Sequence, residues 1–451
     1  MQTIKADLVV KNARICTENG IVFGGMAIKN GKIIAIGGDN ELASGKKELD
    51  VNKKLIIPGL VDLHVHFREP GGTQKEDFFT GTKAAAAGGV TTVFDEPNNI
   101  PITNSLEALE AKLALVKNKA VVDYAFNVSL NSNNLHQIPL FRKFGIKSFA
   151  VFDEIVDTPT GLTHCGILRD ALEQVKQVDG IAFFNCRESK IIDRETARLM
   201  KAGKNTLKDY NQSYPAIAEV LSAAKQLLIA DEIGVKCHFR EVSTLECVNI
   251  FKQLKVKTDT CIEARPDHLF LTQENSEHLG PLAQQWTPIR SEKQSKALWQ
   301  AIDEKIIKVI ASDHATHTFE EKMAGNENIW EAPPGIPAIE SMLPLLLNRI
   351  NEGKLSVERM VELTALNPAK FIGLYPKKGV LKLGSDADFV VVDLEREALI
   401  KGKDYQSKAK WTPFEDWKIK GVPIMTFLRG EKIYEEGRVC ASPGYGQYLE
   451  F

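Results

Sequence analysis

The chain has 451 residues, of which 43% are hydrophobic and 26% charged, as in ordinary water-soluble globular proteins. Its 57 basic and 59 acidic residues leave a net charge of -2, so no global field attracts it to nucleic acid or to an anionic membrane. No apolar run approaches the roughly 20 residues that span a bilayer, and the start of the chain lacks a signal-peptide core. The seven cysteines are scattered without a C-x-x-C spacing, which argues against a disulfide framework and predicts a cytoplasmic location.

Short β patterns separated by turns fill the first fifty residues, and the end of the chain repeats this texture. The predicted strands are 7–10, 25–28, 32–36, 387–393 and 423–428. Asn30-Gly31 lies between two of them and indicates a hairpin, because both residues tolerate the backbone of a tight turn. We expect residues 1–54 and 376–451 to meet in one small β-sandwich domain.

Two histidines separated by one residue, His64 and His66, follow an apolar and β-branched run at 54–61. That run predicts a buried strand, and residues two apart in a strand point to the same side. Both imidazoles can therefore bind one metal ion, since histidine is the commonest side-chain metal ligand. Asp62 and Arg68 add polar groups at the end of an apolar strand, which favours a functional site over two buried structural histidines.

The middle of the chain, residues 55–375, alternates short strands with longer helical patterns. Representative strands are predicted at 90–94, 182–184 and 309–312, and representative helices at 106–119, 216–232 and 357–366. This alternation predicts an α/β fold, most simply a (β/α)8 barrel of the TIM type. Active sites of such barrels lie at the carboxyl ends of the strands, where His64 and His66 would end the first barrel strand.

A second signature comes late in the predicted barrel, where the apolar stretch 309–312 runs into Asp313, His314 and His317. Together with His64-Val-His66, this pattern resembles the amidohydrolase superfamily, and most closely the dihydroorotases of the type found in many bacteria. The resemblance covers nearly the whole chain. Its further segments are 67–71, 75–77, 80–82, 84–92, 96–98, 241–244, 367–369 and 410–414.

The resemblance implies a cyclic amidohydrolase that interconverts N-carbamoyl-L-aspartate and L-dihydroorotate in pyrimidine biosynthesis. A divalent metal, which we expect to be zinc, would activate water and polarise the amide carbonyl. Asp313 is implied to bind this metal, to take the proton of the attacking water and to pass it to the leaving nitrogen. Arg68 and Asn98 match positions that bind the substrate carboxylate, which suits a guanidinium fork, and His317 matches a histidine near the substrate.

Relatives carry a carboxylated lysine or an aspartate on the third barrel strand, where it bridges two metal ions. Alignment of residues 145–152 with lysine-bearing relatives places Ala150 at this position, while Lys147 and Asp153 lie nearby. Aspartate-bridged dihydroorotases favour Asp153. Sequence patterns fix a strand end only to within one or two residues, so the three positions stay open.

Two further ligand positions of the resemblance are altered. Asn185 stands where relatives have a histidine before Cys-Glu, and Glu241 replaces the histidine of their His-Val-Ser-Thr. An amide oxygen is a weak zinc ligand, whereas Glu241 remains a competent oxygen ligand. His238 lies on the opposite face of a regular strand from Glu241, so it serves as a ligand only if the strand bulges.

The candidate metal ligands thus fall into an intact and an altered group. His64, His66 and Asp313 form the intact group, and they predict one well-held zinc ion. The altered group, which we expect to form a weak, remodelled or empty second site, comprises Asp153, Asn185 and Glu241.

Three functions follow from these patterns. The first is a dihydroorotase that acts on a small-molecule substrate and forms a homodimer. The second is a catalytically impaired relative that serves as a structural partner of aspartate carbamoyltransferase, which the altered ligands motivate. The third is another cyclic amidohydrolase, an allantoinase or a dihydropyrimidinase. The absence of a bridging lysine at Ala150 and the presence of Arg68 count against this third function.

Overall fold

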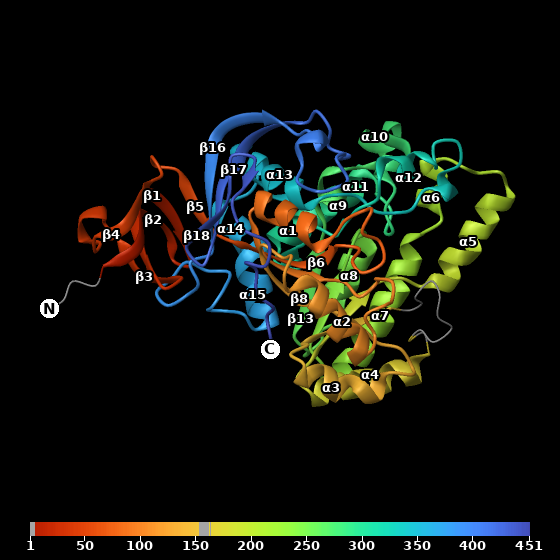
Figure 1. The fold of residues 1–451 in the computed structure, drawn as a ribbon. Coiled ribbons are helices and arrows are strands. Elements are labelled where there is room, and N and C mark those ends of the chain that lie inside the picture. The colour runs from red at the N-terminus through yellow and green to blue at the C-terminus, as the bar shows by residue number, and fades with distance from the viewer. Residues whose placement is uncertain (1–4, 153–161, 163) are drawn as a thin grey trace.

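A computed structural model of the protein describes residues 5–152, 162 and 164–451. The two ends of the chain form one nine-stranded sheet in the order β19-β18-β17-β16-β5-β1-β2-β3, with β4 paired to β1. Its strands are β1 (Ala6–Thr17), β2 (Gly20–Lys29), β3 (Lys32–Gly37), β4 (Gly45–Asp50), β5 (Leu55–Pro58), β16 (Phe389–Leu399), β17 (Lys418–Leu428), β18 (Glu431–Glu435) and β19 (Arg438–Val439). The N-terminal strands lie on the left in Figure 1, beside the blue C-terminal strands.

Tight turns of positive φ connect neighbouring strands of this sheet. The β2–β3 hairpin turns at Asn30, with φ of 49°, and Gly31, with φ of 73°, as the Asn-Gly pair predicts. Arg429 and Gly430 make the corresponding turn between β17 and β18. Because β5 pairs with both β1 and β16, it joins the two ends of the chain and leads directly into the barrel.

The middle of the chain forms the predicted α/β barrel from parallel strands. These are β6 (Leu60–His66), β7 (Val90–Asp95), β8 (Asp123–Phe126), β9 (Val128–Ser129), β10 (Ser148–Val151), β11 (Ile181–Asn185), β12 (Cys237–Arg240), β13 (Thr260–Ala264), β14 (Val309–Ile310) and β15 (His314–Ala315). One sheet runs β15-β6-β7-β8 and the other β14-β13-β12-β11-β10-β9. Only residues 311–313 separate β14 from β15, so the last barrel strand is interrupted where Asp313 lies.

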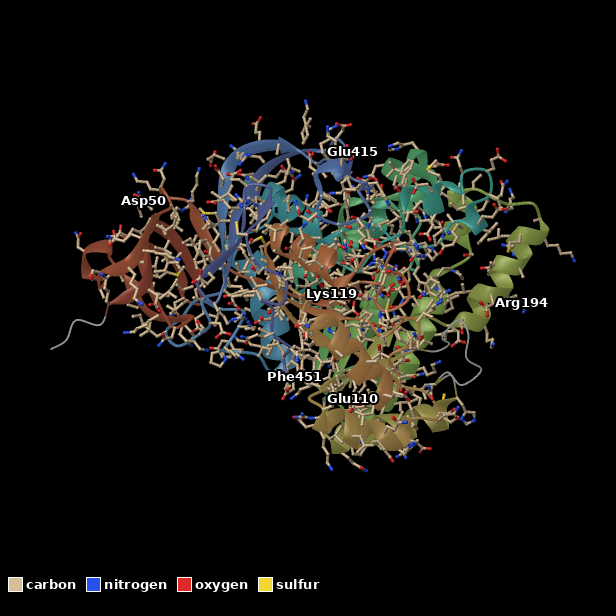
Figure 2. The ribbon with its side chains drawn as sticks, viewed as in Figure 1. Asp50, Glu110, Lys119, Arg194, Glu415 and Phe451 are labelled. Carbon is tan, nitrogen blue, oxygen red and sulfur yellow. The ribbon has the colours of Figure 1, made fainter. Side chains whose placement is uncertain are left out.

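Helices surround the barrel. Their bounds are α1 (Phe78–Ala87), α2 (Leu106–Val116), α3 (Ile138–Lys143), α4 (Cys165–Gln177), α5 (Ser189–Lys201), α6 (Leu207–Gln212), α7 (Ala216–Ile233), α8 (Leu245–Gln253), α9 (Pro266–Phe270), α10 (Gln273–Ser276), α11 (Glu292–Asp303), α12 (Phe319–Met323), α13 (Ile339–Asn351), α14 (Val357–Val361) and α15 (Asn367–Ile372). Helix α5 projects farthest from the β sheet, and Arg194 on it points away from the body of the protein (Figures 1 and 2). Within the described parts of the chain, no helix has both the length and the apolar character needed to cross a membrane.

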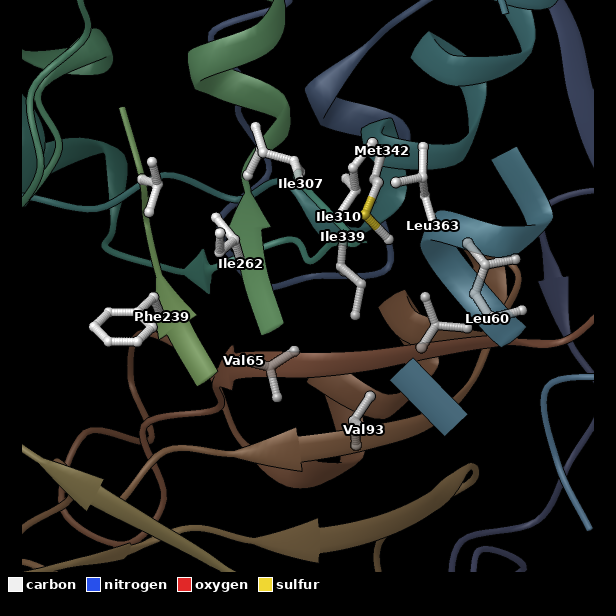
Figure 3. Packing of buried hydrophobic residues seen from close by; sticks show 14 of the residues in the cluster. Leu60, Val65, Val93, Phe239, Ile262, Ile307, Ile310, Ile339, Met342 and Leu363 are labelled. Carbon is white, nitrogen blue, oxygen red and sulfur yellow. The ribbon is translucent and has the colours of Figure 1, made fainter. Parts of the chain in front are cut away.

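Alternate residues of the barrel strands face the helices and the barrel interior. Val65, Phe239 and Ile262 belong to the large cluster that packs strands against helices, as Figure 3 shows. Leu63 and Cys261 belong to a separate buried cluster. Cys261 alternates with Ile262 along β13, whereas Leu63 and Val65 face different sides because the register of β6 shifts between Asp62 and Val65. Burial of each large apolar side chain contributes about 1.5–3 kcal/mol, so these clusters hold the strand ends in fixed positions.

Candidate active site

Three predicted ligands converge at the carboxyl ends of the barrel strands. His64 Nε2 and His66 Nε2 are 3.3 Å apart, and Asp313 Oδ1 lies 3.3 Å from the first and 3.0 Å from the second. Among the described residues, these three form the one group of histidine, cysteine and acidic side chains arranged closely enough to share a metal ion.

Local breaks in two strands aim these side chains at one point. The register of β6 against β7 shifts between Asp62 and Val65, so His64 and His66 turn inward although Leu63 already faces the interior. Asp313 follows the end of β14 and adopts φ of 45°, in the left-handed region that aspartate tolerates better than most residues. The strand predicted to extend to residue 312 therefore ends at Ile310, and the Ser312 amide instead donates to the Asp62 carboxylate over 3.1 Å.

Hydrogen bonds fix the tautomers of both histidines. His64 Nδ1 lies 2.9 Å from Glu263 Oε1, and His66 Nδ1 lies 2.7 Å from Asn98 Oδ1. Both partners are acceptors, so each Nδ1 donates its proton, and each Nε2 faces Asp313, where it can bind a metal ion in place of a proton. A carboxylate or carbonyl behind a histidine in this way orients it as a metal ligand.

The geometry of the three converging atoms fits a tetrahedral metal. Ligands at about 2.0–2.1 Å from a tetrahedral ion lie roughly 3.3 Å from one another, which matches the triangle formed by His64, His66 and Asp313. The electrostatics agree. Burial disfavours a charged imidazole, yet Asp313 and Glu263 raise the pKa of His64 to about 10. The two carboxylates thus create a potential that attracts a cation to this point.

The altered ligand positions lie in a different network. Asn185 Nδ2 donates to Glu241 Oε1 over 2.5 Å, and Asn185 Oδ1 accepts from Arg240 Nη2. Glu241 Oε2 accepts from Arg265 Nη1 over 3.1 Å and from Thr287 Oγ1 over 2.7 Å. The structure therefore does not bring Asn185 or Glu241 into the cluster of His64, His66 and Asp313.

The remaining candidate ligands of the predicted second metal site also lie apart from the cluster of His64, His66 and Asp313. Lys147 precedes β10 and pairs with Asp179 over 3.1 Å, away from the barrel mouth, while Ala150 is buried within β10. Asp153 lies outside the described residues. His238 Nε2 lies 2.8 Å from Glu263 Oε2, so it supports the carboxylate that holds His64.

The strand that carries His238 is not regular as far as Glu241, so the two side chains do not lie on the opposite faces expected of a regular strand. Strand β12 ends at Arg240, and Glu241 takes φ of 59°, which breaks the alternation of a regular strand. The Glu241 side chain therefore reaches Arg265 in the barrel mouth, while His238 reaches Glu263 beneath it.

A cationic corner, defined here by Arg68, Lys75 and Lys322, surrounds the predicted substrate residue His317. Arg68 Nη2 lies 3.3 Å from His317 Nε2, and Lys75 Nζ lies 3.3 Å from His317 Nδ1. Burial, aided by the charges of Arg68 and Lys75, lowers the pKa of His317 to about 2. Glu321 pairs with Lys75 over 3.2 Å at this corner, whereas the Arg68 guanidinium contacts His317 and the Thr316 carbonyl. Arg68 can therefore offer donors to an anion.

Residues near the C-terminus hold this corner in place. Trp411 Nε1 donates to the His317 carbonyl over 2.9 Å, and Lys408 Nζ pairs with Asp77 over 2.6 Å. Although distant in sequence from the barrel mouth, the returning segment thus fixes both loops that carry the cationic side chains.

Sequence reasoning missed several buried charged residues of the site. Glu263, Arg240 and Arg265 are fully buried, and Lys322 is buried against the Gln284 and Pro333 carbonyls. A signal was available, because a polar residue recurs every second position at the ends of β12 and β13, as it does in His64-Val-His66.

Comparison with known proteins identifies the family of this chain. The model of the amidohydrolase family matches residues 55–433. The chain belongs to the amidohydrolase family. It is 35% identical to a dihydroorotase of Methanosarcina mazei, with 98% of each chain covered. It is also 29% identical to an L-hydantoinase of Paenarthrobacter aurescens, again over 98% of each chain.

The solved structures agree with the fold. An L-hydantoinase (dihydropyrimidinase) from Arthrobacter aurescens superposes with a TM-score of 0.95 at 29% identity and covers 99% of this chain and 100% of that one. The predicted barrel and terminal β domain, and the resemblance to dihydroorotases within this family, are confirmed. The family and its relatives make the chain a hydrolase of cyclic amides.

Proposed function

We propose that the protein is a dihydroorotase, which interconverts N-carbamoyl-L-aspartate and L-dihydroorotate with one zinc ion on His64, His66 and Asp313. The cationic corner carries this proposal. Dihydroorotate bears a ring carboxylate, whereas hydantoin and dihydropyrimidine rings are uncharged at the same position. A guanidinium and an ammonium that flank a neutral histidine suit the charged ring, because a guanidinium offers several donors to a carboxylate.

Individual residues are assigned separate roles in this reaction. Arg68 offers its guanidinium to the substrate carboxylate, and His317 stays neutral beside it, held from behind by Trp411. A bound zinc ion would supply Lewis acidity and an activated water. Asp313 lies between the two histidines and is assigned the proton transfer from the attacking water to the leaving amide nitrogen.

The test is turnover by the purified protein. Metal-free chain loaded with zinc should hydrolyse L-dihydroorotate and should close N-carbamoyl-L-aspartate in the reverse direction. Asp313→Asn is nearly isosteric and should retain the fold while losing activity. Absence of turnover with zinc, cobalt and manganese alike would contradict the proposal.

The structural relative favours hydantoin hydrolysis as a second candidate. The superposition with an L-hydantoinase extends over nearly all of both chains. A panel of 5-substituted hydantoins, dihydrouracil, allantoin and dihydroorotate separates the candidates. Preference for an uncharged ring by ten-fold or more in kcat/KM would favour this second function.

The network around Arg265 favours a third candidate, an impaired relative that stabilises aspartate carbamoyltransferase. Such a protein would bind the transferase in size-exclusion chromatography and would show no turnover of dihydroorotate. An active homodimer that does not bind the transferase would remove the need for this role.

A further inference from the structure

The guanidinium of Arg265 lies in the barrel mouth beside the proposed metal centre, where Arg265 is fully buried. Arg265 Nη1 is 2.5 Å from Asp313 Oδ2 and 3.1 Å from Glu241 Oε2. Arg265 Nη2 donates to Asp267 Oδ2 over 2.8 Å and to the Thr287 carbonyl over 3.0 Å. One fixed cation is therefore shared by three carboxylates.

Both carboxylate oxygens of Asp313 therefore have partners. Its Oδ1 faces the Nε2 atoms of His64 and His66, and its Oδ2 faces Arg265. A carboxylate held by a charge-assisted hydrogen bond on one oxygen loses its freedom to rotate. The other oxygen is then presented to the histidines in a single orientation.

The side-chain oxygens of the neighbouring residues Glu241 and Asn185 also accept hydrogen bonds. Glu241 Oε1 accepts from Asn185, and Glu241 Oε2 accepts from Arg265 and Thr287. Arg240, also fully buried, bonds Asn185 Oδ1 over 2.5 Å and forms an ion pair with Glu96. A second metal ion would have to displace a guanidinium from these oxygens.

We propose that Arg265 is a positioning residue that takes the place of a second cation, orienting Asp313 and limiting the centre to one metal ion. This inference rests on the metal centre of the proposed function. A guanidinium suits the task because it is always charged, does not dissociate from the chain and presents several donors in one plane. The planar fork reaches Asp313 and Glu241 through one nitrogen and Asp267 through another.

The experiment counts Co²⁺ ions bound by the metal-free full chain and records their visible absorption, which reports the ligand geometry. Four proteins are compared, namely the wild type, Arg265→Met, Arg265→Lys and Arg290→Met. Arg290 is a matched control, because it is a buried arginine that bonds Ser243 and the Tyr214 carbonyl and does not contact Asp313.

We expect one Co²⁺ per chain for the wild type and for Arg290→Met, with the same spectrum. Arg265→Met should bind a second Co²⁺, because Asp313 Oδ2 and Glu241 Oε2 lose their cation. Arg265→Lys should keep one equivalent with a shifted spectrum, since a single ammonium cannot reproduce the fork. If Arg265→Met does not fold, as judged by circular dichroism, Arg265→Lys carries the test.

Each outcome separates this inference from the function on which it rests. Two Co²⁺ ions per wild-type chain, or an unchanged count and spectrum in the Arg265 variants, would overturn the role of Arg265 and leave the dihydroorotase proposal standing. One Co²⁺ without turnover of dihydroorotate would overturn the function and leave the role of Arg265. Failure of the wild type to bind any Co²⁺ would overturn both.

Discussion

Two halves of the barrel mouth use similar side chains in opposite ways. In the half formed by β6 and the break after β14, two imidazole nitrogens and one carboxylate oxygen converge with no fixed cation among them. In the half formed by the ends of β11, β12 and β13, Glu241 pairs with Arg265, and Arg240 pairs with Glu96, which follows β7. Both oxygens of Glu241 have donor partners, whereas Asp313 keeps Oδ1 directed at the two histidines.

Asp313 is the residue that connects the two halves. It contributes Oδ1 to the histidine half and Oδ2 to the arginine half. The same carboxylate can thus be a metal ligand and the partner of a permanent cation. The following changes test how far the two halves act independently.

Removal of a ligand from the histidine half should have the largest effect. His64→Ala leaves two of three converging groups, so metal occupancy should collapse and kcat/KM should fall roughly 10³-fold or more, since the metal supplies several kcal/mol to the transition state. Metal content by mass spectrometry and steady-state kinetics check this. His136→Ala, at an exposed position, is the control and should change neither quantity. Normal metal content in His64→Ala would show that the centre lies elsewhere.

Removal of Arg68, the proposed anion-binding residue, should separate charged from uncharged substrates. Arg68→Met should lower kcat/KM for dihydroorotate roughly 10²-fold or more, because loss of one partner of a buried charge pair costs about 2–5 kcal/mol. Any activity on an uncharged hydantoin should change less than a few-fold. Arg194→Met on the projecting helix α5 serves as the control. Equal losses on both kinds of ring would refute a carboxylate-binding role.

Glu263 supports the histidine half from behind, and its loss should weaken the metal without abolishing it. Glu263→Gln removes the carboxylate that accepts from His64 Nδ1, so metal affinity should fall about 10–100-fold. Competition with a chromogenic chelator measures the dissociation constant. Glu110→Gln, on the exposed surface of α2, should leave it unchanged. Equal affinities in the two variants would mean that Glu263 does not orient His64.

The smallest effect concerns stability at the cationic corner. Burial, aided by Arg68, lowers the pKa of Lys322 from its ordinary value of 10.5 to about 7. Between these pH values the unfolded chain holds a proton that the folded chain has released, so the free energy of unfolding rises with pH. Below pH 7 both states are charged, and the folded chain carries the full cost of a buried ammonium.

Lys322→Met should lack this rise of the free energy of unfolding with pH. Its stability relative to the wild type should be greatest near pH 6 and should decline by about 2 kcal/mol by pH 9. Urea unfolding at the two pH values measures the difference. A stability difference that does not vary with pH would show that Lys322 is not neutral in the folded protein at pH 9.

Much of the fold and half of the site follow from sequence patterns. Strand–helix alternation predicts the barrel, and the spacing of His64 and His66 predicts a shared metal. Glu263, Arg240 and Arg265 carry the same every-second-residue spacing, yet their roles do not follow from it. The pairing of acidic and basic side chains depends on the order of strands around the barrel. That order brings together residues far apart in the chain.

The sequence by itself determined the parallel barrel, the terminal β sheet and the histidine pair, because these depend on local periodicity and on turn-forming residues such as Asn30-Gly31. Only the tertiary structure decided that Arg265 occupies one side of Asp313 and that His238 supports Glu263. The physical reason is that charges are paired by distance in space. Breaks in strand geometry at Glu241 and Asp313 set those distances, and no local pattern encodes them.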